Sequence, residues 1–185
     1  APQRNPGGVL VPQTEKGLTG KGFEFLAEME RMHMIVDVSH LSDKGFWDIV
    51  KHGTRPFAAS HSNCRALAPH TRNLTDEMIR ALSERGGIAG LNYYALFLDS
   101  DPTHPENCHS TVELIAKHAA HYKQVGGAQM IALGSDFDGI DGPHQLENAA
   151  FLPLLADALR KEGFTEDEVE GIYYRNAMRF FEENL

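Results

Sequence analysis

Two short apolar runs in this sequence are each followed closely by a histidine. His40 follows the run 34–38, and His61 follows the run 56–60. Apolar runs bounded by turn residues are typical of buried strands, and successive parallel strands meet with their C-terminal ends at one edge. Imidazole suits zinc, whose catalytic sites keep one position open for water. We therefore predict that His40 and His61 bind a metal ion; the alternative is a pair of structural histidines.

A carboxylate follows a later apolar run in the same way. Asp136 comes directly after the run 130–134. At the same edge it could bind metal or act as a general base toward an attacking water, the alternative being a carboxylate that caps a turn. The stretch also resembles the start of a calcium loop, but Ile140 and Asp141 stand where an EF-hand needs a ligand and a glycine. Asp138 is interpreted as structural.

Arg72 lies in the loop after the second run. An arginine there could hold a substrate carboxylate through two parallel hydrogen bonds, although a solvated loop arginine is the ordinary alternative. Tyr93 and Tyr94 could line a site, but packing is the favoured interpretation. His118 and His121 have a spacing that could hold a metal on a helix, yet no third ligand is near, so we interpret both as packing and surface residues.

The elements that must position these residues alternate between strand and helix. The expected strands are 34–38, 56–60, 88–93 and 130–134. The expected helices cover about 20–32, 42–52, 75–85, 110–125 and 147–161, with a last one from about 165. Two of them are expected to begin with a capping box, Ser110 with Glu113 and Thr165 with Glu168. Helix-length crossovers require parallel strands. No glycine-rich nucleotide-binding motif follows any strand, and polar residues follow every strand, so part of a (β/α)₈ barrel is favoured over an open sheet.

Composition limits the class of protein. A length of 185 residues fits one domain, 1–185, or a piece of a larger one, and residues 1–18 are expected to form a loop segment. The composition is ordinary for a soluble protein. A net charge of −9 without a basic cluster argues against nucleic acid or anionic membrane as partners. No apolar run approaches the length of a membrane span, and the first residues do not resemble a signal peptide.

Two further features leave questions open. The chain opens without methionine in a Pro- and Gly-rich stretch, so we expect Ala1 to be a cut or truncation point. Cys64 and Cys108 match no zinc-finger or CxxC spacing. We expect free thiols, with a disulfide between them as the alternative, and the cellular compartment stays open.

Four specific motifs occur in order along the chain. They are Asp37-Val38-Ser39-His40, Ser60-His61-Ser62-Asn63, Arg72-Asn73 and Gly134-Ser135-Asp136-Phe137-Asp138-Gly139. Together they resemble the membrane (renal-type) dipeptidase family, zinc metallopeptidases of the amidohydrolase-like barrel superfamily. The resemblance covers nearly the whole chain. It implies a (β/α)₈ barrel whose two-zinc site cleaves dipeptides.

The resemblance also implies a role for each candidate residue. His40 and His61 would ligate the second zinc, Arg72 would hold the C-terminal carboxylate of the substrate, and Asp136 would be the acid/base beside the bridging water. The family's first zinc is bound by a His-x-Asp pair on strand one, a glutamate from strand three bridges both metals, and a histidine on strand four contacts substrate. No stretch here matches these. The chain is therefore expected to be the C-terminal half of the barrel, strands five to eight with their helices.

A half barrel has a physical consequence. A complete barrel needs about 250 residues, and four of its strands alone leave two unpaired edges and an open apolar interior. We therefore expect the N-terminal half on another chain, or a longer natural protein, and an oligomer when this chain is alone.

The leading functional hypothesis is a zinc-dependent dipeptidase in which metal-activated hydroxide attacks the peptide bond. This chain would carry part of the active site and at most one partial zinc site. One alternative is a metal-dependent hydrolase of another amide, a lactam or an ester. The other alternative is an inert fragment that acts as an assembly partner.

Overall fold

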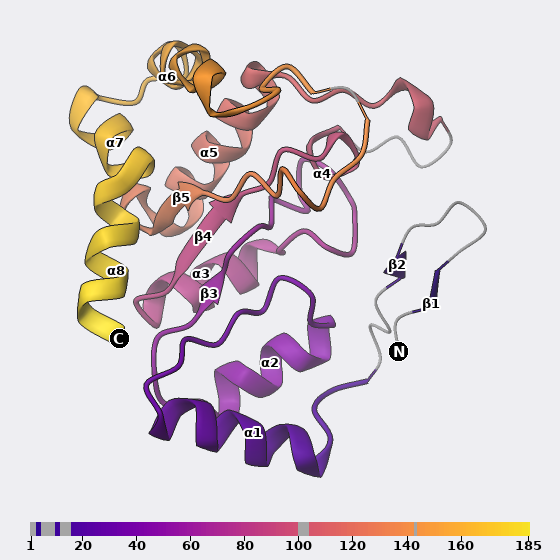
Figure 1. Cartoon of the computed structure of the whole chain (residues 1–185), viewed down its shortest axis with the longest axis vertical. Coiled ribbons are helices and arrows are strands. Elements are labelled where there is room, and N and C mark those ends of the chain that lie inside the picture. The colour runs from indigo at the N-terminus through magenta and orange to yellow at the C-terminus, as the bar shows by residue number, and fades with distance from the viewer. Residues whose placement is uncertain (1–2, 5–9, 12–15, 100–103, 143) are drawn as a thin grey trace.

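The computed structural model describes residues 3–4, 10–11, 16–99, 104–142 and 144–185. Its centre is a three-stranded parallel sheet in the order β3-β4-β5, formed by Ala58–Ala59, Ile88–Leu91 and Ile131–Leu133. Helices connect the strands and pack around the sheet (Figure 1). The parallel α/β arrangement expected from the sequence is therefore confirmed.

Most of the helices follow the predicted periodic segments, and a short helix at 95–98 was not predicted. In chain order the α-helices are α1 (Gly20–Arg31), α2 (Asp43–His52), α3 (Asp76–Glu84), α4 (Ala95–Leu98), α5 (Val112–Gly126), α6 (Leu152–Lys161), α7 (Glu166–Glu170) and α8 (Asn176–Asn184). Short 3₁₀ turns are η1 (Pro105–Asn107), η2 (Ala128–Met130) and η3 (Ala149–Phe151), and η4 (Gly171–Arg175) is a π-helical segment that joins α7 to α8.

Hydroxyl side chains begin most of these helices. Thr19, Ser42, Thr75 and Thr165 each accept a hydrogen bond from a backbone N–H in the first turn, and Thr165 forms the expected capping box with Glu168. The capping box that the sequence suggested for Ser110 is wrong. Thr111 caps α5, while the Ser110 hydroxyl donates to the Tyr93 carbonyl. These caps explain why the helix starts could be predicted closely.

The first expected strand, 34–38, is shorter than predicted. It is reduced to one parallel bridge between Asp37 and Ala58, with Val38 N–H donating to Ala58 O at 2.8 Å and Ala58 N–H to Val36 O at 2.9 Å. The loop expected over 1–18 is also incomplete as a description. Two short strands within it, β1 (Gln3–Arg4) and β2 (Leu10–Val11), pair in antiparallel fashion. The rest of 1–15 lies outside the described residues.

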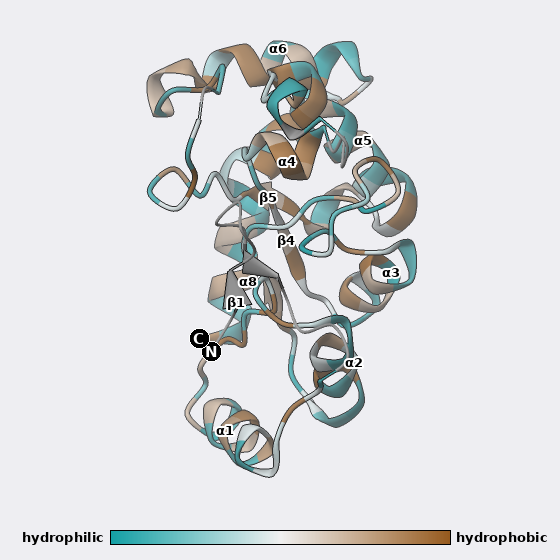
Figure 2. Ribbon diagram, turned by 90° about the vertical axis from the view of Figure 1, so that its right-hand side faces the viewer, coloured by the Kyte–Doolittle hydropathy of each residue, from teal (hydrophilic) through white to brown (hydrophobic). Residues whose placement is uncertain are grey.

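The two faces of the sheet pack against different elements. Ala59, Ala89 and Ile131 belong to the main core, which α2, α3, α5 and α6 complete. In Figure 2 these helices carry both brown hydrophobic and teal hydrophilic stretches, as expected for helices with one buried side. On the other face, Ile88 and Ala132 pack with Phe180 of α8 in a second, smaller cluster.

The C-terminal segment is fastened to the last strand by a buried amide. Asn176 Nδ2 donates to Ala128 O at 2.9 Å and to Ile131 O at 2.8 Å. The segment from α7 to α8 lies along the sheet, and α8 reaches β4 and β5 (Figure 1). Of the helices described, none is both long and apolar enough to cross a membrane.

A buried histidine connects the loop after β3 to α5. His118 is 1% exposed, and its Nδ1 accepts from the Cys64 N–H at 3.0 Å while Nε2 lies 3.1 Å from Leu98 O. The ring is therefore neutral with its proton on Nε2. Burial lowers the pKa of His118 to about 4, although the bond to Leu98 opposes the shift. Cys64 and Cys108, both within the described chain, are not joined by a disulfide, as expected.

This neutral histidine makes stability depend on pH. Its folded pKa of about 4 lies below the ordinary 6.5, so unfolding takes up a proton and the stabilisation is lost as pH falls from 6.5 toward 4. We expect the free energy of unfolding to fall by about 2 kcal/mol between about pH 7 and about pH 5 for this reason. Urea unfolding of the protein and of His118→Asn should show a shallower pH slope in the variant. The exposed His109→Asn is the control, and an unchanged slope in His118→Asn would contradict the prediction.

Candidate active site

The two predicted metal ligands meet at the C-terminal ends of segment 34–38 and of β3, the two β segments that precede them. His40 Nε2 and His61 Nε2 are 2.8 Å apart, and their ring centroids are separated by 4.9 Å. Both follow the backbone bridge between Asp37 and Ala58, which holds the two segments in parallel register. Desolvation lowers the pKa of both histidines, and the positive charge of Arg72 adds to it. Neutral imidazoles with converging nitrogens are suited to binding one metal ion.

The Asp37 carboxylate ties these two segments together. Its Oδ1 accepts from Ser39 N at 3.1 Å, Ser39 Oγ at 3.0 Å and Ser60 N at 3.0 Å, and its Oδ2 accepts from Ser60 Oγ at 2.5 Å. Ser60 Oγ also lies 2.7 Å from His61 Nδ1. Desolvation raises the pKa of Asp37, but the hydrogen bonds from Ser60 and Ser39 outweigh it and the net pKa is lowered. The sequence motifs contained these residues, but no pattern indicated the contact.

Arg72 lies buried beside the histidines. It is 8% exposed, its Nε donates to Ser39 O at 2.6 Å, and its guanidinium carbon lies 5.2 Å from the centre of the Phe97 ring. Its Nη2 is buried and has no hydrogen-bond partner among the residues that the structure describes. Burial lowers the pKa of Arg72, which Asp136 and Asp37 oppose. A buried guanidinium with an unused donor is prepared for an anionic ligand.

Asp136 is held by an asparagine that the sequence gave no reason to select. Asn92 Nδ2 donates to Asp136 Oδ2 at 3.0 Å. Asn92 itself exchanges hydrogen bonds with Asn63: its N–H donates to Asn63 Oδ1, and its carbonyl accepts from Asn63 Nδ2. Asp136 has φ of 62°, in the left-handed region that aspartate and asparagine tolerate better than most residues. The turn after β5 thus presents this carboxylate in one defined orientation.

His70, which no sequence pattern selected, also belongs to this region. Its Nδ1 accepts from the Arg72 N–H at 3.1 Å, and its ring lies 4.6 Å from that of Phe97. Burial, with Arg72 and Arg65 contributing, lowers the pKa of His70 to about 4. The ring is therefore neutral at physiological pH and supports the backbone of Arg72.

The other candidates behave as packing residues. Tyr93 is fully buried against Phe137, and Asp138 is exposed in its turn. His118 binds backbone groups, and His121 Nε2 lies 2.7 Å from Asp76 Oδ1. The interpretations of Tyr93, His118 and His121 as packing and surface residues agree with the structure, and the structural role of Asp138 stays a prediction.

The donor set fits part of a metal site. Within the described ranges, no group of three or more His, Cys, Asp or Glu side chains is arranged to hold a metal ion. His40 and His61 supply two nitrogen ligands, and four-coordinate zinc needs further ones. Asp136 and Arg72 both act electrostatically on the two histidines, so all four predicted residues share one neighbourhood.

The comparison that decides the family is with its sequence model. The model of the membrane dipeptidase family, peptidase family M19, matches residues 5–184. This chain belongs to the membrane dipeptidase family. The relationship expected from the four motifs is therefore confirmed, and the match includes all four candidate residues.

Individual relatives agree with the assignment to the membrane dipeptidases. An uncharacterized protein in the pqqA 5′ region of Klebsiella pneumoniae is 38% identical over 168 residues, which are 91% of this chain and 61% of that protein. An uncharacterized dipeptidase of Schizosaccharomyces pombe is 33% identical over 167 residues, which are 89% of this chain and 39% of that protein.

A solved structure gives the same result for the fold. A metallo peptidase from Rhodobacter sphaeroides, liganded with a phosphinate mimic of the dipeptide L-Ala-D-Ala, matches with a TM-score of 0.86 and 33% identity. The match covers 94% of this chain and 49% of that chain. This chain thus spans between 39% and 61% of the three proteins compared.

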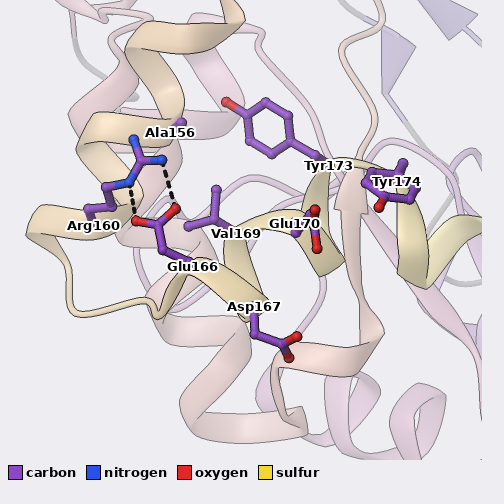
Figure 3. Close-up of a pocket in the computed structure, with 8 residues that line it drawn as sticks. All are labelled: Ala156, Arg160, Glu166, Asp167, Val169, Glu170, Tyr173 and Tyr174. Atoms are coloured by element: carbon purple, nitrogen blue, oxygen red, sulfur yellow. Dashed lines mark hydrogen bonds and ion pairs between the residues drawn. The ribbon is translucent and has the colours of Figure 1, made fainter.

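A surface hollow elsewhere on the molecule is a weaker candidate. It lies beside α6, α7 and η4, where Arg160 forms two hydrogen bonds with Glu166 (Figure 3). Arg160 also pairs with Asp157, and Tyr173 donates its hydroxyl to Leu152 O. Because these polar groups already have partners, we place the candidate active site of this chain at the strand ends.

Two glycines allow the strand ends of this family member to approach closely. A Cβ added at Gly90 or at Gly134 would lie 2.0 Å from the Ser60 carbonyl oxygen, and the backbone itself would have to move. We predict that Gly90→Ala destabilises the protein by about 2 kcal/mol or more, measured by urea unfolding. Gly20→Ala, where an added Cβ meets nothing within 4 Å, is the control. Equal stability of the two variants would show that the close approach is not required.

Proposed function

We propose that this chain forms the C-terminal half, strands five to eight, of a (β/α)₈ barrel in a zinc-dependent dipeptidase. The observation that carries the proposal is the approach of His40 Nε2 to His61 Nε2, at 2.8 Å, beside Arg72 and Asp136. Family membership and the share of each relative that the chain spans support it. The barrel's other half, on another chain or in a longer protein, would then supply the remaining ligands, and this chain alone would associate.

His40 and His61 would hold one metal ion through their Nε2 atoms. Zinc bound there would lower the pKa of a coordinated water to about 7 and so provide hydroxide near neutral pH. To bind zinc, the protein must keep both imidazole rings neutral. Burial and the charge of Arg72 do so, because they lower the pKa of each histidine.

Arg72 would bind the C-terminal carboxylate of a dipeptide. Its Nε is already used by the Ser39 carbonyl, so the guanidinium plane is fixed, while Nη2 remains available within the described structure. The Phe97 ring supports the guanidinium from one side. A fixed arginine that recognises a free carboxylate would select short peptides by the position of their C-terminus.

Asp136 would accept a proton from the attacking water and return it to the leaving amine. Asn92 Nδ2 donates to Oδ2 of this carboxylate, so within the part of the chain that the structure describes Oδ1 is left for the proton transfer. The left-handed backbone at Asp136 and the Asn92 contact together orient the carboxyl group before substrate binds.

Asp136→Asn tests the acid/base role without changing shape. Asparagine tolerates the left-handed backbone, and its amide cannot take up the proton. We expect kcat for dipeptides to fall by about 100-fold in the complete, zinc-loaded enzyme, as is usual for loss of a general acid/base. Zinc content, measured in parallel, should not change. A loss smaller than about tenfold would contradict the proposed role.

Arg72→Ala tests the substrate class. Loss of a charged hydrogen bond should raise KM for free dipeptides by about 10- to 100-fold. Dipeptide amides, which have no terminal carboxylate, should be affected much less. The exposed Arg80→Ala is the control. If Arg72→Ala hydrolyses free dipeptides normally, the carboxylate clamp is wrong, and an amide, lactam or ester substrate without that group becomes the better proposal.

A further inference from the structure

We propose that Asp37 and Ser60 form a hydrogen-bond relay that fixes the tautomer of His61, with the ring proton on Nδ1 and a lone pair on Nε2. The two serve as positioning residues for His61. The relay rests on the proposed function only in that His61 would bind metal through Nε2. The contacts concerned are Asp37 Oδ2 to Ser60 Oγ at 2.5 Å and Ser60 Oγ to His61 Nδ1 at 2.7 Å.

The direction of the relay follows from counting hydrogens. The Ser60 hydroxyl has one hydrogen and two short contacts. A carboxylate has no hydrogen to donate, so the hydroxyl must give its hydrogen to Asp37. Ser60 Oγ then faces His61 Nδ1 as an acceptor, and Nδ1 must carry the proton. The opposite order would leave the Ser60 and Asp37 oxygens in contact without a hydrogen between them.

Asp37 cannot turn to relieve this arrangement. Its Oδ1 accepts from the Ser39 N–H, the Ser39 hydroxyl and the Ser60 N–H, which are fixed donors from both β segments. Ser39 is itself fixed, because its hydroxyl accepts from the His61 N–H at 3.0 Å. Oδ2 is therefore the oxygen that faces Ser60, and the relay has one geometry.

The consequence appears at the other ring nitrogen. A neutral imidazole with its proton on Nδ1 presents a lone pair at Nε2, the atom that faces His40 Nε2. Metal-binding histidines commonly donate their second N–H to a carboxylate or carbonyl, which fixes the ring and its tautomer. Here a hydroxyl stands between the ring and the carboxylate.

Asp37→Asn should reverse the relay. The three donors at Oδ1 would keep the amide oxygen of the asparagine in that position, and the amide NH₂ would then face Ser60 Oγ. Ser60 would accept from the amide and give its hydrogen to His61 Nδ1. The proton of the ring would move to Nε2, and metal binding would be weakened because it must first displace that proton. Ser60→Ala, in contrast, removes the preference without reversing it.

The order of zinc affinities among the variants therefore distinguishes a relay from simple packing. In the complete protein, zinc affinity measured by competition with a chromophoric chelator should fall by about tenfold in Ser60→Ala and by about 100-fold in Asp37→Asn. Asp37→Asn combined with Ser60→Ala should bind no more weakly than Asp37→Asn alone. Ser62→Ala is the matched control, since the buried Ser62 hydroxyl has no partner among the described residues. If Asp37→Asn, the substitution of most similar shape, binds zinc better than Ser60→Ala, the relay is wrong.

A second measurement needs no metal and is made on the protein without substitution, since a variant serves only to assign the signals. In ¹⁵N spectra of the metal-free protein with labelled histidine, a protonated and a bare ring nitrogen resonate in separate ranges. The His61 signals, assigned by their loss in His61→Gln, should show the proton on Nδ1. A proton on Nε2 would overturn the proposal. If Nδ1 carries the proton and the complete protein binds no zinc, the relay stands and the proposed function fails.

Discussion

One carboxylate holds together the two chain segments on which the candidate site depends. Asp37 accepts hydrogen bonds from its own segment, through Ser39, and from the next, through the backbone and hydroxyl of Ser60. Backbone pairing between these segments is limited to one bridge, so the carboxylate replaces sheet hydrogen bonds that a longer strand would make. The separation of His40 from His61 follows from this contact. Removing the Asp37 carboxylate would therefore affect both ligands together.

The charge of Arg72 acts in two directions in this small volume. Its positive charge helps to lower the pKa of His40, His61 and His70, which keeps these rings neutral. Asp136 and Asp37 oppose the lowering of its own pKa. A fixed cation beside neutral imidazoles disfavours protonation of the metal ligands and leaves a positive charge for an anionic substrate. The same residue would thus serve metal binding and substrate binding.

Local features of the sequence predicted the helices and the strand order, because helix caps and apolar periodicity depend on neighbours along the chain. His40, His61 and Asp136 could be selected because each closely follows a strand, whereas Arg72 was selected through the resemblance to the family motif. The first strand was overestimated, since pairing across its other edge is needed to extend it and periodicity does not report that partner. Asn92, His70 and the link from Asp37 through Ser60 could not be selected, because their roles arise from contacts between segments that are distant in sequence. Thr111, and not Ser110 as predicted, caps α5, because the Ser110 hydroxyl donates to the Tyr93 carbonyl.

The packing of Phe180 on the sheet has a consequence for the order of events during synthesis. Ile88 and Ala132 are translated before the helix that covers them, which lies near the end of this sequence. While the polypeptide grows on the ribosome, this face of the sheet stays open to water and to other nascent chains until α8 has emerged. Asn176 then joins that helix to the last strand. Of the strands that form this face, the one translated first waits longest for its cover, and that interval is when chaperones would be needed.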